Sequence, residues 1–234
     1  MSSISAIRFD NRIAVVTGAG GGLGRAHALL LAARGAKVVV NDLGGTLNGA
    51  GGSNAAADKV VAEIVAAGGI AVPNYDNIAS PEGARSLIKT AVDAFGRVDV
   101  LINNAGILRD KSLAKMDPAD FASVVAVHLL GSAYCSQVAL GHMQGQAYGR
   151  IVMTTLAAVA FLASEACELT GEVIAAGAGY LARVQIMESR GVRLAPADVT
   201  PEAVAANWEK IADMSGARPF DSAAAALAGA FLPN

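Results

Sequence analysis

Short apolar segments alternate with helix-forming segments along the first two thirds of this chain. The apolar segments are rich in β-branched residues, and most of the segments between them hold about 10–15 residues with good helix formers. Strands are expected at residues 13–17, 37–42, 70–76, 98–103 and 150–155, and helices at residues 25–34, 55–67, 81–95 and 117–143. Such alternation builds right-handed βαβ units, and nearly unbroken apolar strands indicate a sheet that is covered on both faces. The sequence therefore predicts an α/β fold with a doubly wound parallel sheet.

The last third of the chain follows a less regular pattern. A helix is expected at residues 156–167, a strand at 172–176 and a helical tail at 201–214. No internal repeat is visible in the sequence. We therefore expect a single domain over residues 1–234, with a C-terminal helical extension over about residues 181–234.

The composition excludes several classes of protein. Apolar residues make up 53% of the 234 residues and charged residues 16%, whereas a disordered chain is poorer in apolar residues and richer in charge. The net charge of −2 includes no basic block, so nucleic acid is not expected as a partner. The apolar stretch Ile151–Ala163 has 13 residues, whereas a membrane span needs about 20, so no membrane segment is expected.

The chain ends and the cysteines bear on cellular location. The first ten residues lack the basic start and apolar run of a signal peptide, and the final residues Leu232–Asn234 are not a peroxisomal address. Cys135 and Cys167 stand alone, without the spacing of metal ligands, so no metal site is expected. A cytosolic chain would keep both thiols reduced. These features predict a cytoplasmic protein.

A glycine-rich turn directly follows the first expected strand. Gly18, Gly22 and Gly24 lie in the segment TGAGGGLG, between that strand and the next helix. Glycines let the backbone bend and approach a diphosphate closely, and a helix N-terminus attracts the negative charge. Taken alone, the motif is also compatible with a tight structural turn. Asp42 favours the dinucleotide site of a Rossmann-type fold, because it ends the second strand 18 residues after Gly24.

Asp42 also indicates which dinucleotide is bound. A carboxylate at this position accepts hydrogen bonds from both ribose hydroxyls and repels a 2′-phosphate. Two like charges about 4 Å apart cost on the order of 4 kcal/mol at an effective dielectric constant of about 20. Gly21 offers no cation to a 2′-phosphate. NAD is therefore expected rather than NADP, with a strand-end turn as the alternative role of Asp42.

Several motifs together resemble those of the short-chain dehydrogenase/reductase family. They are TGAGGGLG at 17–24, NDLGG at 41–45, NYDN at 74–77 and NNAG at 103–106. The segments RFDNR, NNAGILRDKS and VHLLGS resemble one branch, the (3R)-hydroxyacyl-CoA dehydrogenase unit of type 2 peroxisomal multifunctional enzymes, which is also a hydroxysteroid dehydrogenase. The resemblance covers residues 8–155 and about 161–212.

The resemblance implies which residues bind the cofactor. The matching positions are Gly18, Gly22, Leu23, Gly24, Asp42, Leu43, Asp76, Asn77, Asn104, Ala105 and Gly106. The first four would line the pyrophosphate and the nicotinamide, Asp42 would hold the adenosine ribose, and Asp76 with Asn77 would flank the adenine. Asn104 would also tie neighbouring strands together. A strand end for Asn104 and a turn for Asp76 are the structural alternatives.

The residues that perform catalysis in this family are missing. The family uses a tyrosine that exchanges a proton with the substrate, a lysine four residues later that lowers the pKa of the tyrosine, and a serine upstream. None of the four tyrosines has a lysine four residues later, and no lysine lies between Lys115 and Lys210. Leu156 stands where the serine is expected.

Two substitutes for the missing residues are weak. Tyr180 and Arg183 have a spacing of three instead of four. His128 occupies a helix position that supports catalysis in the family, although a structural role is more common for a lone histidine on a helix that packs against a sheet. His128 is therefore the one catalytic candidate, in a supporting position.

A region of the family fold is also missing after Thr155. Only 15 residues separate Thr155 from Gly171, enough for one helix, whereas the resemblance implies two helices, a strand and a substrate loop, on the order of 70 residues. A deletion here would leave unpaired backbone groups in the sheet, at roughly 1–3 kcal/mol for each buried group. We therefore favour a protein with a further segment near the Thr155–Leu156 junction over a true deletion.

These observations predict an NAD-dependent short-chain dehydrogenase/reductase that interconverts a secondary alcohol and a ketone. The resemblance implies a (3R)-3-hydroxyacyl-CoA or a hydroxysteroid as substrate, and a homodimer or homotetramer. If the 234 residues are the whole chain, the alternative is a non-catalytic NAD-binding protein. A purely structural glycine-rich domain, which would not bind NAD, is the third interpretation.

Overall fold

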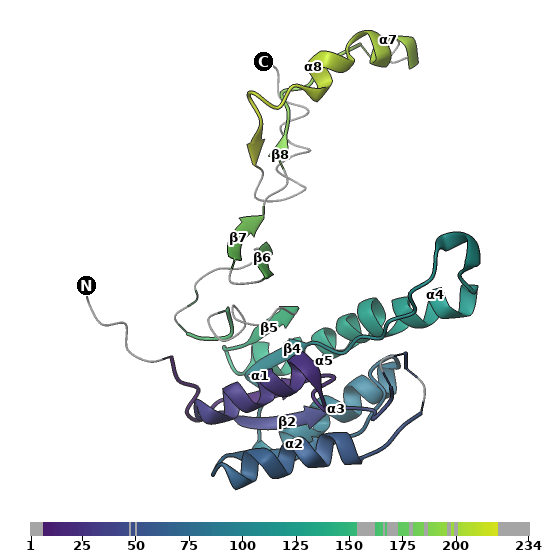
Figure 1. Cartoon of the computed structure of the whole chain (residues 1–234). Coiled ribbons are helices and arrows are strands. Elements are labelled where there is room, and N and C mark those ends of the chain that lie inside the picture. Colours follow the sequence, from purple (N-terminus) through teal and green to yellow (C-terminus); the bar gives the residue numbers. More distant parts are fainter. Residues whose placement is uncertain are drawn as a thin grey trace. The chain divides into compact units, whose positions relative to one another are not determined.

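The computed structural model describes residues 7–46, 48–49, 51–153, 162–165, 167, 173–177, 180–184, 187–195, 198 and 201–219. The chain divides into two compact units, Met1–Leu169 and Thr170–Asn234, where the sequence predicts a single domain (Figure 1). Most of the helix expected at 156–167 lies outside the described residues.

A parallel sheet of five strands forms the centre of the first unit. The strands are β1 (Ile13–Val16), β2 (Lys37–Asn41), β3 (Ile70–Asn74), β4 (Val100–Asn103) and β5 (Arg150–Met153). Their order is β3-β2-β1-β4-β5, and every neighbouring pair is parallel. The strand order reverses at β1, which confirms the predicted doubly wound sheet and places a ligand-binding crevice at its carboxyl edge.

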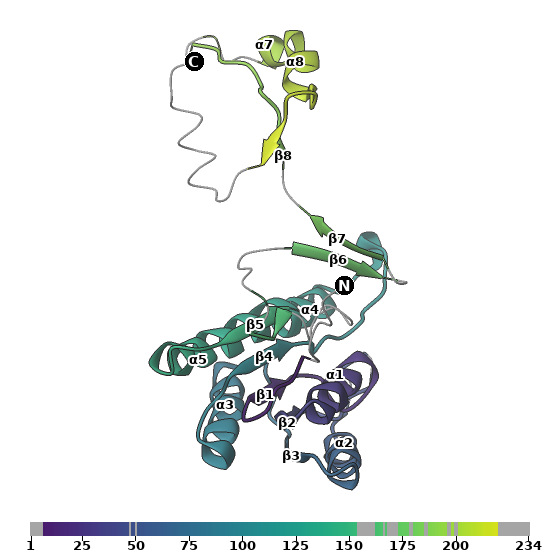
Figure 2. The same cartoon turned by 90° about the vertical axis from the view of Figure 1, so that its left-hand side faces the viewer.

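Helices cover both faces of this sheet (Figure 2). They are α1 (Gly22–Ala33) and α2 (Ala55–Ala66) on one face, and α3 (Pro81–Phe95) and α5 (Ser132–Gly145) on the other. Alternate residues of β1 enter two separate cores: Ala14 and Val16 pack on the side of α1 and α2, and Ile13 and Val15 pack on the side of α3 and α5. Burial of both faces explains why the strands have no polar alternation.

The bounds of α3 agree with the helix expected at residues 81–95, and local features define both of its ends. Ser80 caps the N-terminus, because its Oγ accepts a hydrogen bond from the backbone N of Gly83 at 3.0 Å. Pro81 occupies the first turn, where no N–H partner is needed. Gly96 ends the helix with a left-handed φ of +83°.

The helix expected at 117–143 is present but is not uniform. α4 (Pro118–Val125) continues through the π-helical segment η2 (Ala126–Gly131) into α5. Together they span 28 residues, Pro118–Gly145, and this helix is long and apolar enough, by length and composition only, to cross a membrane. The expectation of no membrane segment rested on unbroken apolar stretches, whereas polar residues interrupt this helix. In the first unit, α5 packs against α3 and β4 through one buried face.

The described part of the second unit contains two small antiparallel sheets and two short helices. β6 (Val173–Gly177) pairs with β7 (Tyr180–Val184), and β8 (Met187–Glu188) pairs with β9 (Arg218–Pro219). The helices are α7 (Pro201–Ala206) and α8 (Trp208–Ala212), within the expected helical tail. The strand expected at 172–176 thus forms a hairpin with β7 and does not join the parallel sheet. The connection between β6 and β7 is too short for a parallel crossover, so these two strands pair antiparallel.

Candidate functional site

The glycine turn between β1 and α1 brings backbone segments too close together for side chains. A Cβ atom on Gly24 would lie 2.2 Å from the carbonyl oxygen of Gly18, and one on Gly18 would lie 2.7 Å from the Cα of Ala105. Gly18 and Gly22 have positive φ angles of +61° and +51°. Helix α1 begins at Gly22, earlier than the expected start at residue 25. The bare turn therefore forms the N-terminus of the helix, where free N–H groups attract anions.

Asp42 follows β2 and is held by two backbone donors. Its Oδ2 accepts a hydrogen bond from Gly20 N at 2.8 Å, and its Oδ1 accepts one from Gly44 N at 2.7 Å. A Cβ on Gly20 would lie 2.7 Å from the Asp42 carboxyl carbon, so this position also requires glycine. The carboxylate is thereby fixed beside the glycine turn.

A cavity of about 610 Å³ lies at the carboxyl edge of the sheet, and we call it the cofactor cavity. All eleven cofactor-binding residues expected from the sequence line it, namely Gly18, Gly22, Leu23, Gly24, Asp42, Leu43, Asp76, Asn77, Asn104, Ala105 and Gly106. Sequence reasoning missed further lining residues, among them Gly20, Thr46, Gly49, Ile107 and Val127. Of these, Gly20 belongs to the glycine run, and Ile107 and Val127 lie in segments that resemble the family branch. Thr46 and Gly49 lie outside the motifs named above.

Thr17 and Asn104 join the end of β4 to the glycine turn. The hydroxyl of Thr17 accepts hydrogen bonds from the backbone N of Asn104 at 2.9 Å and of Ala105 at 3.0 Å. The Asn104 side-chain amide donates to the carbonyl oxygens of Thr17 at 2.9 Å and Gly18 at 3.1 Å. The structure thus shows Asn104 tying β1 to β4, as the family resemblance implies.

His128 lies on η2, against the segment that follows Asn104. A Cβ on Gly106 would lie 2.5 Å from Cε1 of His128, so the imidazole packs directly on the glycine backbone. Its Nε2 lies 3.0 Å from both the backbone N and the carbonyl oxygen of Ile107. The tautomer decides which of these is a hydrogen bond, because one nitrogen cannot accept and donate at once. Either hydrogen bond would hold the Gly106–Ile107 backbone beside the cofactor cavity.

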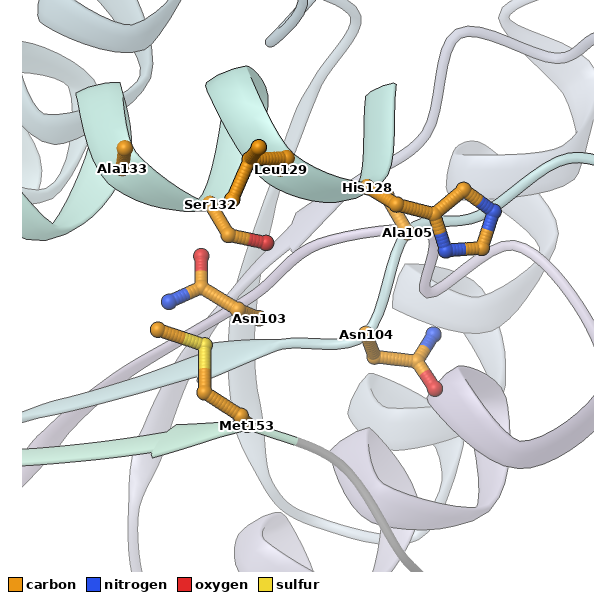
Figure 3. A pocket seen from close by; sticks show the side chains of 8 residues that line it. All are labelled: Asn103, Asn104, Ala105, His128, Leu129, Ser132, Ala133 and Met153. Carbon is orange, nitrogen blue, oxygen red and sulfur yellow. The ribbon is translucent and has the colours of Figure 1, made fainter. Parts of the chain in front are cut away.

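A second cavity of about 520 Å³ adjoins the first and is lined by Asn103, Asn104, Ala105, His128, Leu129, Ser132, Ala133 and Met153 (Figure 3). Asn104 and Ala105 line both cavities. The Asn103 side chain donates to Ser136 Oγ at 3.1 Å, and its buried Oδ1 has no hydrogen-bond partner among the described residues. This acceptor is buried, and neither a tyrosine nor a lysine lines the second cavity.

The tyrosines whose side chains the structure describes have other roles. The hydroxyl of Tyr75 donates to Asp58, and this hydrogen bond raises the pKa of the phenol. Tyr134, on α5, is partly buried and packs against the core on the side of α3. Tyr148 stacks with the Arg12 guanidinium 3.7 Å from its ring centre. The structure describes the backbone of Tyr180, on β7, but not its side chain. It assigns no replacement for the missing catalytic tyrosine among Tyr75, Tyr134 and Tyr148.

The fold and the cavity residues define a class of protein, and comparison with known families agrees. A family model described as short chain dehydrogenase matches residues 12–164. The chain therefore belongs to the short-chain dehydrogenase family of oxidoreductases, which confirms the resemblance found in its sequence motifs.

Three relatives indicate the branch of the family. Peroxisomal multifunctional enzyme type 2 of Mus musculus is 38% identical over 283 aligned positions, which cover 91% of this chain and 38% of the mouse protein. Peroxisomal hydratase-dehydrogenase-epimerase of Saccharomyces cerevisiae is 59% identical over 148 positions, covering 63% of this chain and 16% of the yeast protein. The solved structure of full-length peroxisomal multifunctional enzyme type 2 from Drosophila melanogaster has a TM-score of 0.78 and 33% identity, covering 95% of this chain and 49% of that one. The chain thus spans less than half the length of each.

The mouse alignment also bears on the missing region. Because 91% of 234 residues is about 213 residues, the 283 aligned positions include about 70 that have no counterpart in this chain. The yeast alignment of 148 positions covers 63% of the chain, about 147 residues, and so contains almost no gap. The size of the gap agrees with the helix–strand–helix region expected after Thr155.

The names of the relatives overturn the predicted location. The mouse, yeast and Drosophila proteins are all named as peroxisomal enzymes, so the prediction of a cytoplasmic protein is wrong. That prediction relied on the two ends of this chain. The relatives contain the matched region within much longer proteins, whose targeting signals can lie outside it.

Proposed function

We propose that this chain binds NAD in the cofactor cavity and belongs to an NAD-dependent dehydrogenase that interconverts a secondary alcohol and a ketone. The substrate would be a (3R)-3-hydroxyacyl-CoA or a hydroxysteroid, and the location peroxisomal, in line with the names of the relatives. The observation that carries the proposal is that eleven expected residues from four separate segments line one cavity.

The glycine turn fits the diphosphate of a dinucleotide. A Cβ on Gly21 or Gly22 would meet nothing within 4 Å, so open space lies over the first turn of α1. The close approach of Gly24 to Gly18 keeps the other side of the turn free of side chains. Backbone N–H groups and the helix dipole can therefore act on a diphosphate directly.

Asp42 supports NAD over NADP. Its carboxylate is pinned by Gly20 N and Gly44 N, so it cannot turn away from a ribose that enters the cavity. Ribose hydroxyls can donate to the carboxylate oxygens, whereas a 2′-phosphate would bring a second negative charge against them.

When bound, NAD supplies the acceptor for the hydride that leaves the alcohol carbon, and the hydroxyl proton is released as the ketone forms. The residues of this chain would hold the cofactor and position the substrate. The second cavity adjoins the cofactor cavity at Asn104 and Ala105, and the reacting part of a substrate would lie there. The proton acceptor would come from the family segment expected near Thr155–Leu156, and the assembly would be a homodimer or homotetramer.

A second candidate is a protein that binds NAD without turnover. The observation in its favour is that no serine, and no tyrosine followed four residues later by lysine, is present in the expected region of the sequence. General acid–base catalysis contributes typically about 10²–10⁴-fold to a rate, so its loss would leave binding with little chemistry.

Three measurements on the purified protein separate these functions. Intact-mass spectrometry compares the protein with the 23.5 kDa of the sequence, and a mass several kDa larger would reveal the further segment. Calorimetric titration measures NAD binding, and NADH absorbance with a (3R)-3-hydroxyacyl-CoA measures turnover. Binding with turnover supports the dehydrogenase, and binding without turnover supports the second candidate. Absence of binding would refute both.

A further inference from the structure

We propose that a cavity at the amino edge of the parallel sheet binds a phosphate dianion, as the free ion or as a phosphate monoester. The cavity has a volume of about 410 Å³, and we call it the arginine cavity. It shares no described residue with the cofactor cavity or the second cavity, so phosphate binding there does not depend on NAD. Its charged and aromatic lining residues are Arg8, Arg12, Arg97, Asp10, Glu165 and Tyr148.

The arginine cavity lies where three neighbouring strands begin. Arg12 directly precedes β1, Arg97 comes three residues before β4, and Tyr148 comes two residues before β5. These strands lie side by side in the sheet (Figure 2). Parallel strands begin at one edge of a sheet and end at the other, and the cofactor cavity lies at the carboxyl edge. The arginine cavity is therefore at the opposite edge from the proposed NAD site.

The buried carboxylate of Asp99 holds two of the arginines in place. Its side chain is fully buried and accepts hydrogen bonds from Arg12 Nη1 at 3.2 Å and from Arg97 Nη2 at 2.6 Å. The backbone N of Ile13 donates to the same carboxylate at 2.9 Å. Removal of either arginine would leave buried charge poorly compensated. Both guanidinium groups are therefore fixed before a ligand arrives, which lowers the entropic cost of binding.

Arg12 already contacts an anion on the side away from Asp99. Its guanidinium stacks on Tyr148, and its Nη2 pairs with the carboxylate of Glu165. The Glu165 side chain is 68% exposed. An exposed ion pair contributes little to stability, so a ligand with more negative charge can displace this carboxylate. Glu165 thus occupies the donor that a phosphate oxygen would use.

Arg8 and Arg97 have further donors to offer. Arg8 donates from Nε and Nη2 to Asp10, both at 2.7 Å. Arg97 donates from Nε and Nη2 to Asp99. The Nη1 atoms of these two arginines have no hydrogen-bond partner among the described residues, and each carries two N–H groups. Planar guanidinium groups of this kind match the geometry of phosphate oxygens.

The charges around the cavity favour a dianion. Arg150 lies 5.0 Å from the centre of the Tyr148 ring, so four arginines surround the cavity. Asp10 and Asp99 balance two of the four positive charges. Once Glu165 is displaced, a surplus of two positive charges remains. This surplus equals the charge of a phosphate dianion and exceeds that of a carboxylate, so phosphate should be preferred over acetate.

Calorimetric titration with inorganic phosphate at about pH 8, where phosphate is mainly a dianion, tests the proposal. Acetate at the same ionic strength is the comparison, and we expect phosphate to bind at least about tenfold more tightly. Glycerol phosphate separates the two sources of the dianion. Tighter binding of this monoester supports a site for a larger phosphorylated molecule, and tighter binding of inorganic phosphate supports a site for the free ion. If neither binds, or if acetate binds as tightly as both, the proposal is overturned.

Two variants should change the affinity for phosphate in opposite directions. Arg8→Gln should weaken binding by about tenfold, and the fold should persist because Arg8 pairs with an exposed aspartate. Glu165→Gln removes the competing carboxylate and should strengthen binding by about three- to tenfold. Arg85→Gln and Glu82→Gln are the matched controls, because these residues form an exposed pair on α3 and line none of the three cavities. Both controls should keep the affinity within about twofold.

The glycine turn is the other place where phosphate could bind, and Gly24→Ala separates the two sites. The new Cβ would lie 2.2 Å from the carbonyl oxygen of Gly18 and would disrupt the turn. Phosphate binding that survives Gly24→Ala and responds to Arg8→Gln supports the arginine cavity. An affinity that changes in neither Arg8→Gln nor Glu165→Gln overturns the proposal, and its loss in Gly24→Ala would then assign the phosphate to the turn.

Discussion

Replacement of Asp42 by asparagine should remove most of the preference for NAD over NADP. The carboxylate is held by Gly20 N at 2.8 Å and Gly44 N at 2.7 Å, so a 2′-phosphate cannot avoid it by side-chain rotation. A 2′-phosphate charge about 4 Å from the carboxylate would be repelled, and this repulsion would weaken NADP binding by on the order of 4 kcal/mol at an effective dielectric constant of about 20. That energy corresponds to about a thousandfold in affinity. Asparagine keeps the size of the side chain and removes its charge.

Calorimetric titration of both proteins with NAD and NADP at low ionic strength measures this preference. In Asp42→Asn, we expect NAD to bind about tenfold more weakly and the preference to narrow from about a thousandfold to about tenfold. Asp117→Asn is the control, because Asp117 caps α4 through Ala119 N and lines neither cavity. If Asp42→Asn keeps the full preference, Asp42 does not face the ribose and the assignment is refuted.

Three further predictions concern the glycine turn and the stability of the first unit. Gly24→Ala should abolish NAD binding, because its Cβ would lie 2.2 Å from Gly18 O; calorimetry on protein with unchanged circular dichroism checks this, and near-normal affinity would contradict it. Asp99→Ala should lower the free energy of unfolding by about 3 kcal/mol, because the buried carboxylate accepts hydrogen bonds from Ile13 N and from two arginines. Urea unfolding measures this loss, and a loss under about 1 kcal/mol would argue against the network. Burial lowers the pKa of His27 below its ordinary 6.5, so the unfolded state binds more protons and stability should fall as the pH drops below about 6.5, by up to about 1.4 kcal/mol per pH unit. His27→Leu should flatten this slope in urea unfolding between about pH 7 and about pH 5, and an unchanged slope would assign it to other groups.

The parallel sheet could be predicted because its signals are local. A strand that is buried on both faces needs a continuous apolar segment, and Val38–Val40 is such a segment in β2. The ends of α3 depend on Ser80 and Gly96, whose capping roles follow from their chemistry. The predicted start of α1, residue 25, is later than the observed start at Gly22, because glycine has a poor helix propensity. The path of the chain after β1 brings these glycines into the first turn of the helix.

The cofactor cavity was predictable where motifs carry its residues. Asp42 and Gly24 were found by spacing alone, since both belong to the same βαβ unit. Thr46 was missed, because it lies outside the motifs and reaches the cavity only through the path of the folded chain. The long helix was likewise predicted as one continuous element at residues 117–143, whereas the π-helical geometry of η2 emerges only from the backbone.

The sequence by itself determined the alternation of strands and helices, the glycine turn and the acid at the end of β2, because each depends on neighbours a few residues away. It also revealed the lack of a tyrosine–lysine pair, which no folding can supply. The tertiary structure decided which polar residues meet. Asn41 and Asn74 are 33 residues apart and hydrogen-bond because β2 and β3 pair in one register. Register depends on the packing of both faces of the sheet, which no local pattern specifies.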